Sequence, residues 1–117
     1  MVNKEATRYY SDIHEKKVCK LLGAKQTPNS GAGHWRKGDA HQEEASLLIE
    51  CKTCVEEKKS FSIKKDWIIK NKEEAFSQRL NNTCIAFNFE PNGMNYFVID
   101  EKLMKFLVDK LMEENNN

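Results

Sequence analysis

The alternation of apolar and polar positions divides the chain into helical and extended segments. A first helix is predicted from about Glu5 or Thr7 to Leu22, because apolar residues recur there every three or four positions. Gly23 follows as a normal C-terminal glycine, since this residue readily takes the left-handed conformation at a helix end. The predicted helix therefore makes about five turns.

Two further helices are predicted in the second half of the chain. One runs from about Ile63 to Leu80, with Ser62 as its N-cap. The other spans 101–112 behind a capping Asp100 and carries seven apolar residues in twelve positions. A helix that buries a single apolar stripe needs fewer apolar residues than this, so part of the helix is expected to face another subunit. The polar residues 113–117 are expected to form a disordered tail.

Extended segments are predicted where apolar residues alternate or run together between turn residues. They lie at about 38–41, 46–54, 83–89 and 95–99, with a shorter strand-like position at Phe61. Residues 24–37, which include Gly, Ser, Asn and Pro, are expected to form a loop. The expected fold is α/β (α+β), with helices on a central mixed sheet in the order α-β-β-β-α-β-β-α. We expect a single domain that spans residues 1–117.

The composition indicates a protein without a membrane segment. Charged residues make up 32% of the chain, and no apolar run approaches the roughly 20 residues of a membrane helix. The N-terminal residues also lack the apolar core of a signal peptide. We therefore expect a cytoplasmic protein, in a bacterial, archaeal or phage-infected cell.

The four cysteines are expected to be free thiols, because disulfides are rare in a reducing cytosol. Cys51 and Cys54 have the CxxC spacing of zinc and redox sites. If one strand runs through both residues, however, their side chains point to opposite faces and cannot bind one ion together. Because a second CxxC or nearby histidine pair is also missing from the sequence, we favour free thiols in the core.

Charged residues also gather around the predicted strand at 46–54. Asp39 precedes a ten-residue spacer, and Glu50-Cys51-Lys52 then closes an apolar run. Side chains alternate in a strand, so Glu50 and Lys52 share one face while Cys51 points to the other. Burying Glu50 and Lys52 is costly, and a divalent metal held by Asp39 and Glu50 would compensate that cost.

This pattern predicts a metal-dependent nuclease centre. The expected ion is Mg²⁺, for which Mn²⁺ would substitute, and its predicted ligands are Asp39, Glu50 and the backbone carbonyl of Cys51. Lys52 would orient the attacking water or neutralise the transition state. An ordinary ion pair between Glu50 and Lys52, with Asp39 as a turn residue, is the plainer interpretation of the same residues.

Two polar residues of the first helix also face its apolar side. At about 100° per residue, Glu15 lies within the apolar stripe, between Leu22 and Cys19. A carboxylate there needs a partner, and both a structural and an active-site role remain open for it. His14 lies at the margin of the same arc, where a satisfied boundary histidine is favoured over a metal ligand.

The order of these residues resembles the core of the PD-(D/E)xK nuclease superfamily. The resemblance rests on Gly38-Asp39, with Gly in place of the usual Pro, and on Glu50-Cys51-Lys52 after the spacer. The upstream Glu15 and the small-residue loop 29–33 extend it to the archaeal-type and phage Holliday junction resolvases. It covers roughly residues 9–100, and it implies a restriction-endonuclease-like fold.

The resemblance also implies roles for residues that spacing alone does not assign. It implies that Glu15 is a further metal ligand, direct or through water, and that Ser30 lies near the scissile phosphate. Gly31 and Gly33 would let the loop backbone approach that phosphate closely. Gln78 is a further, weaker candidate, because related nucleases often place a Lys or Gln near the metal from the helix after the core.

Basic residues are unevenly distributed although the net charge is only +1. Six lysines against one acid lie between positions 58 and 72, including Lys64 and Lys65. His34, Arg36 and Lys37 form a second basic turn around an aromatic residue. A basic rim around an acidic centre suits a phosphate backbone cut at a metal, although each lysine alone could simply be solvated.

Together these features favour a structure-selective endodeoxyribonuclease of the Holliday junction resolvase type. It would act on four-way or other branched DNA as a homodimer, because two symmetric active sites match two symmetric strands. A nicking or restriction-like endonuclease on duplex DNA is the second interpretation. The third is a catalytically silent nucleic-acid-binding or assembly module.

Overall fold

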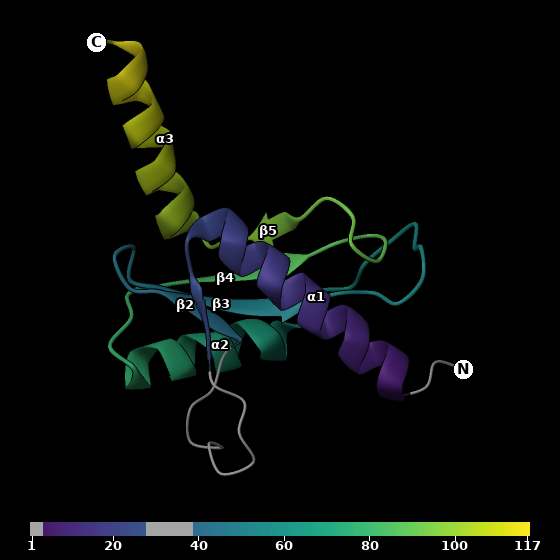
Figure 1. Ribbon diagram of the computed structural model, residues 1–117. Helices are drawn as coiled ribbons and strands as arrows, with labels where there is room; N and C mark the ends of the chain where they lie inside the picture. The colour runs from purple at the N-terminus through teal and green to yellow at the C-terminus, as the bar shows by residue number, and fades with distance from the viewer. Residues whose placement is uncertain (1–3, 28–38) are drawn as a thin grey trace.

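A five-stranded mixed sheet lies at the centre of the computed structural model, which describes residues 4–27 and 39–117 (Figure 1). The strands follow the order β1-β2-β3-β4-β5 across the sheet. β3 and β4 run parallel, whereas the other neighbouring pairs are antiparallel. Their bounds are Lys25–Gln26 for β1, Ala40–Gln42 for β2, Leu47–Lys52 for β3, Asn82–Phe87 for β4 and Tyr96–Val98 for β5.

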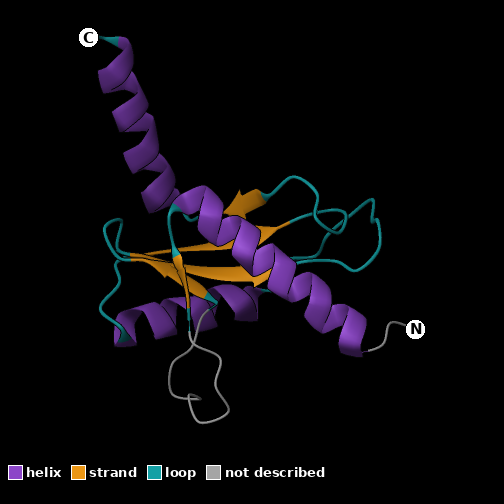
Figure 2. Cartoon of the chain, viewed as in Figure 1, coloured by secondary structure: helices purple, strands orange, loops and turns teal. Residues whose placement is uncertain are grey.

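In the described part of the chain, three helices accompany this sheet, namely α1 (Lys4–Leu22), α2 (Lys65–Ser77) and α3 (Glu101–Asn115). α1 and α2 cover opposite faces of the sheet, while α3 extends away from it (Figure 2). The described elements therefore follow the expected order α-β-β-β-α-β-β-α in an α+β fold. None of these helices is long and apolar enough to cross a membrane.

The end of α1 follows directly from its sequence. Gly23 has φ +64°, the left-handed conformation that costs glycine little. The next residue, Ala24, donates its backbone N–H to the carbonyl of Cys19 at 2.9 Å, which is the bond of a Schellman motif. The predicted helix end at Gly23 is thus confirmed, and the sharp turn leads the chain straight into β1.

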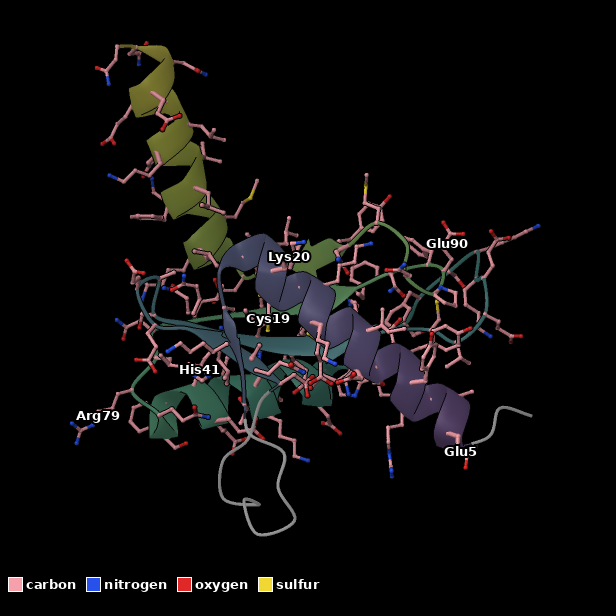
Figure 3. The ribbon with its side chains drawn as sticks, viewed as in Figure 1. Glu5, Cys19, Lys20, His41, Arg79 and Glu90 are labelled. Atoms are coloured by element: carbon pink, nitrogen blue, oxygen red, sulfur yellow. The ribbon has the colours of Figure 1, made fainter. Side chains whose placement is uncertain are left out.

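The main core lies between α1 and the sheet. Its fully or almost fully buried members come from α1 and three strands, namely Val18, Ala40, Ile49, Cys84 and Ala86. Cys19 packs against this cluster from α1, over the sheet (Figure 3). Because side chains alternate along β3, the neighbours of Ile49 face α2 instead.

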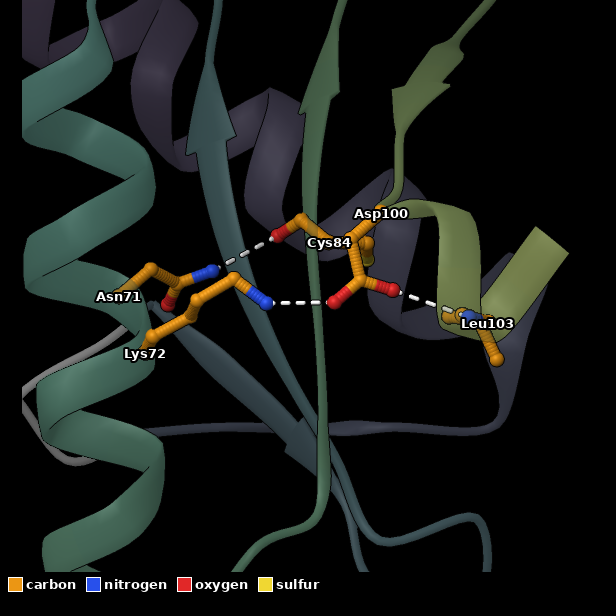
Figure 4. Close-up of polar contacts among 5 residues, drawn as sticks. All are labelled: Asn71, Lys72, Cys84, Asp100 and Leu103. Atoms are coloured by element: carbon orange, nitrogen blue, oxygen red, sulfur yellow. Dashed lines mark hydrogen bonds and ion pairs between the residues drawn. The ribbon is translucent and has the colours of Figure 1, made fainter.

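α2 and the base of α3 are joined to β4 and to each other by polar contacts (Figure 4). The buried Asn71 side chain donates from Nδ2 to the carbonyl of Cys84 at 3.2 Å. Lys72 forms an ion pair with Asp100, which holds the pKa of that carboxyl below its usual range. The other Asp100 oxygen accepts from the backbone N–H of Leu103 at 2.9 Å, so the predicted cap of the last helix is confirmed.

Three local predictions were wrong. Residues 25–26 form β1 rather than loop, and they pair with Ala40 and His41. Phe61 lies outside any strand, and α2 is preceded by Lys64 in extended conformation rather than capped by Ser62. β1 escaped prediction because it is short and polar, and its pairing with β2 stabilises it.

The predicted strands at 46–54 and 83–89 both end earlier than expected, at Lys52 and Phe87. The buried Asn88 side chain explains why: its Oδ1 accepts from the backbone N–H of Cys54 at 3.2 Å and replaces further strand pairing. The prediction of a disordered tail at 113–117 was also wrong in part, because α3 continues to Asn115.

All four cysteines are free, as predicted. Cys54 and Cys84 are buried, and Cys19 and Cys51 are half-buried. Burial raises the pKa of the Cys84 thiol to about 12 and raises that of Cys51 further. These thiols therefore stay protonated near neutral pH and act as apolar core groups.

Candidate active site

The antiparallel register of β2 and β3 brings Asp39 and Glu50 together. Ala40 pairs with Ile49, so the same register places the preceding Asp39 opposite Glu50. The backbone N–H of Asp39 donates to the Ile49 carbonyl at 3.2 Å, and the two carboxyl groups share a hydrogen bond. The structure thus assembles the two acids that the sequence places a ten-residue spacer apart.

Asp39 is fixed by the end of the β2–β3 pairing. β2 begins at Ala40, so the last residues of β3 have no partner on that strand. Oδ2 of Asp39 accepts from the backbone N–H of Cys51 at 2.6 Å and takes the place of the missing strand. One carboxylate oxygen is therefore anchored to the backbone, next to the Cys51 carbonyl predicted as a ligand.

Glu50 is held in an environment that disfavours its charge. Burial is the main cause of its raised pKa, followed by the hydrogen bond to Asp39 and the negative charge of that residue. Lys52 opposes the shift, and Glu74 on α2 adds to it. Two carboxyl groups this close retain a proton between them unless a cation takes its place.

Glu15 approaches the pair from α1. It is half-buried, as predicted, and burial together with the charge of Asp39 raises its pKa to about 7. Its Oε1 accepts a 3.5 Å hydrogen bond from Nε2 of Gln26, and the next residue, Thr27, donates its backbone N–H to the Asp39 carbonyl at 2.9 Å. β1 therefore positions both Glu15 and Asp39, which sequence reasoning missed.

The Lys52 ammonium lies over an aromatic ring. Its Nζ is 4.5 Å from the ring centroid of Trp67 on α2, within the range of a cation–π contact. Lys64 approaches the same ring at 5.7 Å. Trp67 is in turn held by Phe61, whose ring packs on Phe87, the β4 residue opposite Lys52. This aromatic support restricts where the ammonium can go.

Trp67 and Glu74 are the contributors that sequence reasoning did not find. Trp67 precedes Asn71 and Ala75 at four-residue intervals, but the burial of those two residues, which marks the sheet-facing side of α2, is known only from the structure. Glu74 lies four residues from both Lys70 and Gln78 on one face of the helix, but the resemblance indicates only Gln78 as a site candidate.

The other predicted site residues divide into three groups. Ser30, His34, Arg36 and Lys37 lie outside the described residues. Lys64 and Lys65 are exposed around the start of α2, where a phosphate backbone can reach them. Gln78 is the C-cap of α2, one turn beyond Glu74, and it is Glu74 whose charge acts on Glu50.

His14 was predicted to be a satisfied histidine at the margin of the apolar arc, but it is buried, and its Nδ1 has no hydrogen-bond partner among the described residues. The residue belongs to α1, and its Nε2 lies 2.7 Å from Oδ1 of Asn95, just before β5. Burial lowers its pKa. The nearby Lys17 bonds the carbonyls of Asn92 and Gly93, so both side chains tie α1 to the turn after β4.

An open groove runs along α1 beside Glu15. It has a volume of about 700 Å³ and is lined by charged and polar groups, among them Arg8, Tyr9, Asp12 and Gln26. Tyr9 is 62% exposed, so its ring is accessible from solvent. The groove gives a ligand access to Glu15, whereas Asp39 and Glu50 do not line it.

The carboxylate pair offers oxygen ligands of the kind that a divalent cation prefers. Among residues 4–27 and 39–117, no three His, Cys, Asp or Glu side chains are grouped closely enough to hold a metal ion. Asp39 and Glu50 nevertheless form a carboxylate pair next to a backbone carbonyl. Mg²⁺ is commonly held by one or two carboxylates, with waters and substrate phosphate as its other ligands. The chemistry of the pair therefore fits such an ion.

Comparisons with protein-family profiles, curated proteins and solved structures found no match.

Proposed function

We propose that this protein is a metal-dependent endodeoxyribonuclease that hydrolyses phosphodiester bonds, with four-way junction DNA as its preferred substrate. The observation that carries the proposal is the Asp39–Glu50 carboxyl pair, with Lys52 on the same face of β3. A purely structural ion pair explains neither the paired acids nor their shared hydrogen bond. A cation site explains both, because the cation would replace the shared proton.

Each residue of the site has a role in this chemistry. Asp39 and Glu50 would hold the cation, and the Cys51 N–H keeps Asp39 in place. When bound, Mg²⁺ supplies a Lewis acid and lowers the pKa of a water molecule; Mn²⁺ would substitute. Lys52, supported by Trp67, can orient the attacking water or neutralise charge on the phosphate.

Glu15 contributes from the opposite side of the pair. It is bonded to Gln26 rather than to Asp39 or Glu50, so its role in the described geometry is electrostatic. An additional negative charge beside Asp39 strengthens the attraction of the site for a divalent cation.

The preference for DNA junctions rests on charge and on the sequence resemblance. Lys64 and Lys65 present positive charge at the N-terminal end of α2, on the side of the sheet that carries Lys52. Such a rim attracts a phosphate backbone regardless of base sequence. The resemblance to Holliday junction resolvases favours branched DNA over duplex DNA.

Cleavage of labelled four-way junction, flap, duplex and single-stranded DNA, with Mg²⁺, Mn²⁺ or EDTA, tests the proposal. We expect junction cleavage with either metal and none in EDTA. Glu50→Gln and Asp39→Asn should each lower the rate by at least about 10³-fold, because they remove a charge from the site while keeping its shape. Glu73→Gln, on the exposed side of α2, is the matched control.

The outcomes also separate the alternative functions. Equal cleavage of duplex and junction would indicate a nicking or restriction-like endonuclease. DNA binding without cleavage under any metal would indicate a silent binding module. Retained cleavage in both acid variants would refute the site itself.

A further inference from the structure

α3 is an amphipathic helix with almost no packing partner among the residues that the structure describes. Leu103 is its only half-buried residue, and the other fourteen positions are exposed. The helix leaves the sheet at its base and points away from it (Figure 1). A helix of this length is marginal in water without packing, so a surface outside the described chain is expected to cover it.

The apolar side of α3 is too wide for one contact. At about 100° per residue its apolar side chains span an arc of roughly 240°, against about 100° for a helix that covers a single surface. The exposed members, between 39% and 59% accessible, are Met104, Phe106, Leu107, Val108, Leu111 and Met112. Two different surfaces are therefore needed to cover the helix.

A groove at the base of α3 offers one such surface. It has a volume of about 690 Å³ and lies between the helix and the sheet, with Leu22, Leu47, Phe97 and Ile99 among its walls. Phe106 and Leu107 of α3 line its outer side, so the groove is continuous with the exposed helix face. An apolar segment laid along α3 would enter the groove as well.

The charges of α3 are complementary to those of an antiparallel copy. Residues 101–107 contain two lysines and one acid, whereas 108–115 contain one lysine and three acids. Glu113 and Glu114 lie at the negative end of the helix dipole, where negative charge is unfavourable, and the last turn contains no basic residue to offset them. Antiparallel pairing would bring Lys102 of a second copy toward this acidic end.

We infer that α3 is a dimerisation helix, which packs antiparallel against α3 of a second copy while its remaining apolar side covers that copy's groove. A second copy related by a twofold axis supplies both covering surfaces, its own α3 and its own groove. An unrelated partner with a single groove or a single helix would supply only one of them. Six side chains per copy, at on the order of 100 Å² each, bury about 1,200 Å² from the helices alone. Adding the groove walls approaches the roughly 1,600 Å² of a standard stable interface.

The inference concerns assembly and does not depend on nuclease activity. If both proposals hold, the dimer carries two carboxylate sites, as symmetric cleavage of a junction requires. The test therefore omits DNA and metal, so that failure of the dimer and failure of the nuclease can be told apart.

Light scattering on the full chain should give about twice its mass of 13.6 kDa at micromolar concentration. Leu111→Glu and Met104→Glu should each weaken dimerisation at least tenfold, because a charge would enter the apolar interface. Both side chains are exposed in the single chain, so circular dichroism should show an intact fold. Phe76→Glu is the matched control, because Phe76 is 86% exposed but lies on α2.

A charge exchange tests the antiparallel arrangement. Lys102→Glu and Glu114→Lys should each weaken the dimer several-fold, and the double variant should recover most of the loss. A wild-type chain that stays monomeric at about 100 µM, or a dimer indifferent to both α3 variants, would overturn the inference. A double variant no better than the singles would overturn the antiparallel pairing.

Discussion

α1 and α3 are both amphipathic helices, but only α1 packs its apolar side against the sheet. α1 buries Val18 and His14 against the sheet, and its neighbours Cys19 and Leu22 pack on the core. α3 buries none of its residues, although most of its apolar side chains are as large as those of α1. Periodicity therefore predicts that a helix has an apolar face, but not which surface covers that face.

The difference follows from the ends of the two helices. α1 ends in a Schellman turn at Gly23 that reverses the chain into β1, so the helix lies back across the sheet. α3 begins at the capped Asp100, which Lys72 fixes at the edge of the sheet, and from there the helix points away from the sheet (Figure 1). We expect α1 and the sheet to carry the chemistry, and α3 to carry assembly.

Variants of Lys52 and of its aromatic support should show the largest difference between the two regions, because they should impair cleavage but not assembly. Lys52→Ala should lower junction cleavage by about 10²–10³-fold, because it removes one group that stabilises the transition state. Trp67→Leu should lower it about tenfold, because the ammonium loses a cation–π contact worth on the order of 1 kcal/mol and its fixed position. Gel-based cleavage rates under single-turnover conditions measure both effects.

Two controls make this result specific. Trp67→Phe should recover part of the rate, because a smaller aromatic face remains under Lys52. Lys105→Ala on α3 should leave single-turnover chemistry unchanged, since that lysine is exposed and forms an ion pair with Asp109 of the same helix. Equal losses for the α3 and Trp67 variants would contradict the division of roles.

Much of the fold could be predicted from the sequence, because strong periodic signals coincide with packed elements. The apolar run before Glu50 formed β3, and the first helix ended at Gly23 as expected. β1 could not be predicted, because two polar residues become a strand only through pairing with β2. The early ends of β3 and β4 depend on the buried Asn88, whose bond to Cys54 spans thirty-four positions.

The candidate site shows the same limit. The proximity of Asp39 and Glu50 could be predicted, because two neighbouring antiparallel strands supply them. The support of Lys52 by Trp67 could not, since it requires knowing which side of α2 packs on the sheet. The contact between Gln26 and Glu15 could not be predicted either, because Gln26 lies in β1, which forms only through pairing with β2.

A matched pair of valines sharpens the comparison of α1 with α3. Val18→Ala removes methyl groups from a fully buried position and should lower the free energy of unfolding by about 2 kcal/mol. Val108→Ala, at a position 39% exposed, should change it by less than about 0.5 kcal/mol. Urea denaturation in a Leu111→Glu background measures both without a contribution from assembly. Equal losses would show that α3 packs on its own chain.

Glu15 should make stability depend on pH in the absence of metal. Its pKa is raised from 4.5 to about 7 in the folded state, so its contribution is present below about pH 4.5 and is lost as the pH rises through 7. Wild type should therefore lose stability between pH 5 and 8, and Glu15→Gln should reduce that loss by about 1–2 kcal/mol, allowing for solvent screening.

Thermal melts in EDTA at the two pH values test this dependence, with the exposed Glu73→Gln as control. Glu50 acts in the same direction, so some pH dependence should remain in the Glu15 variant. Adding Mg²⁺ at pH 8 should raise the wild-type melting temperature, because the ion binds the folded state. An identical pH profile for wild type and Glu15→Gln would contradict the environment assigned to Glu15.

The smallest effect is expected from the basic rim, and it separates α2 from α3. Lys65→Ala should weaken junction binding two- to five-fold and lower the slope of log affinity against log salt by about 0.9, the contribution of one phosphate contact. Lys105→Ala, at a lysine of α3 that is also exposed, should leave that slope unchanged if α3 serves assembly alone. Fluorescence anisotropy with an uncleaved junction in Ca²⁺ or EDTA measures both slopes. A reduced slope for Lys105→Ala would mean that DNA also contacts α3, which joins the two regions in one binding surface.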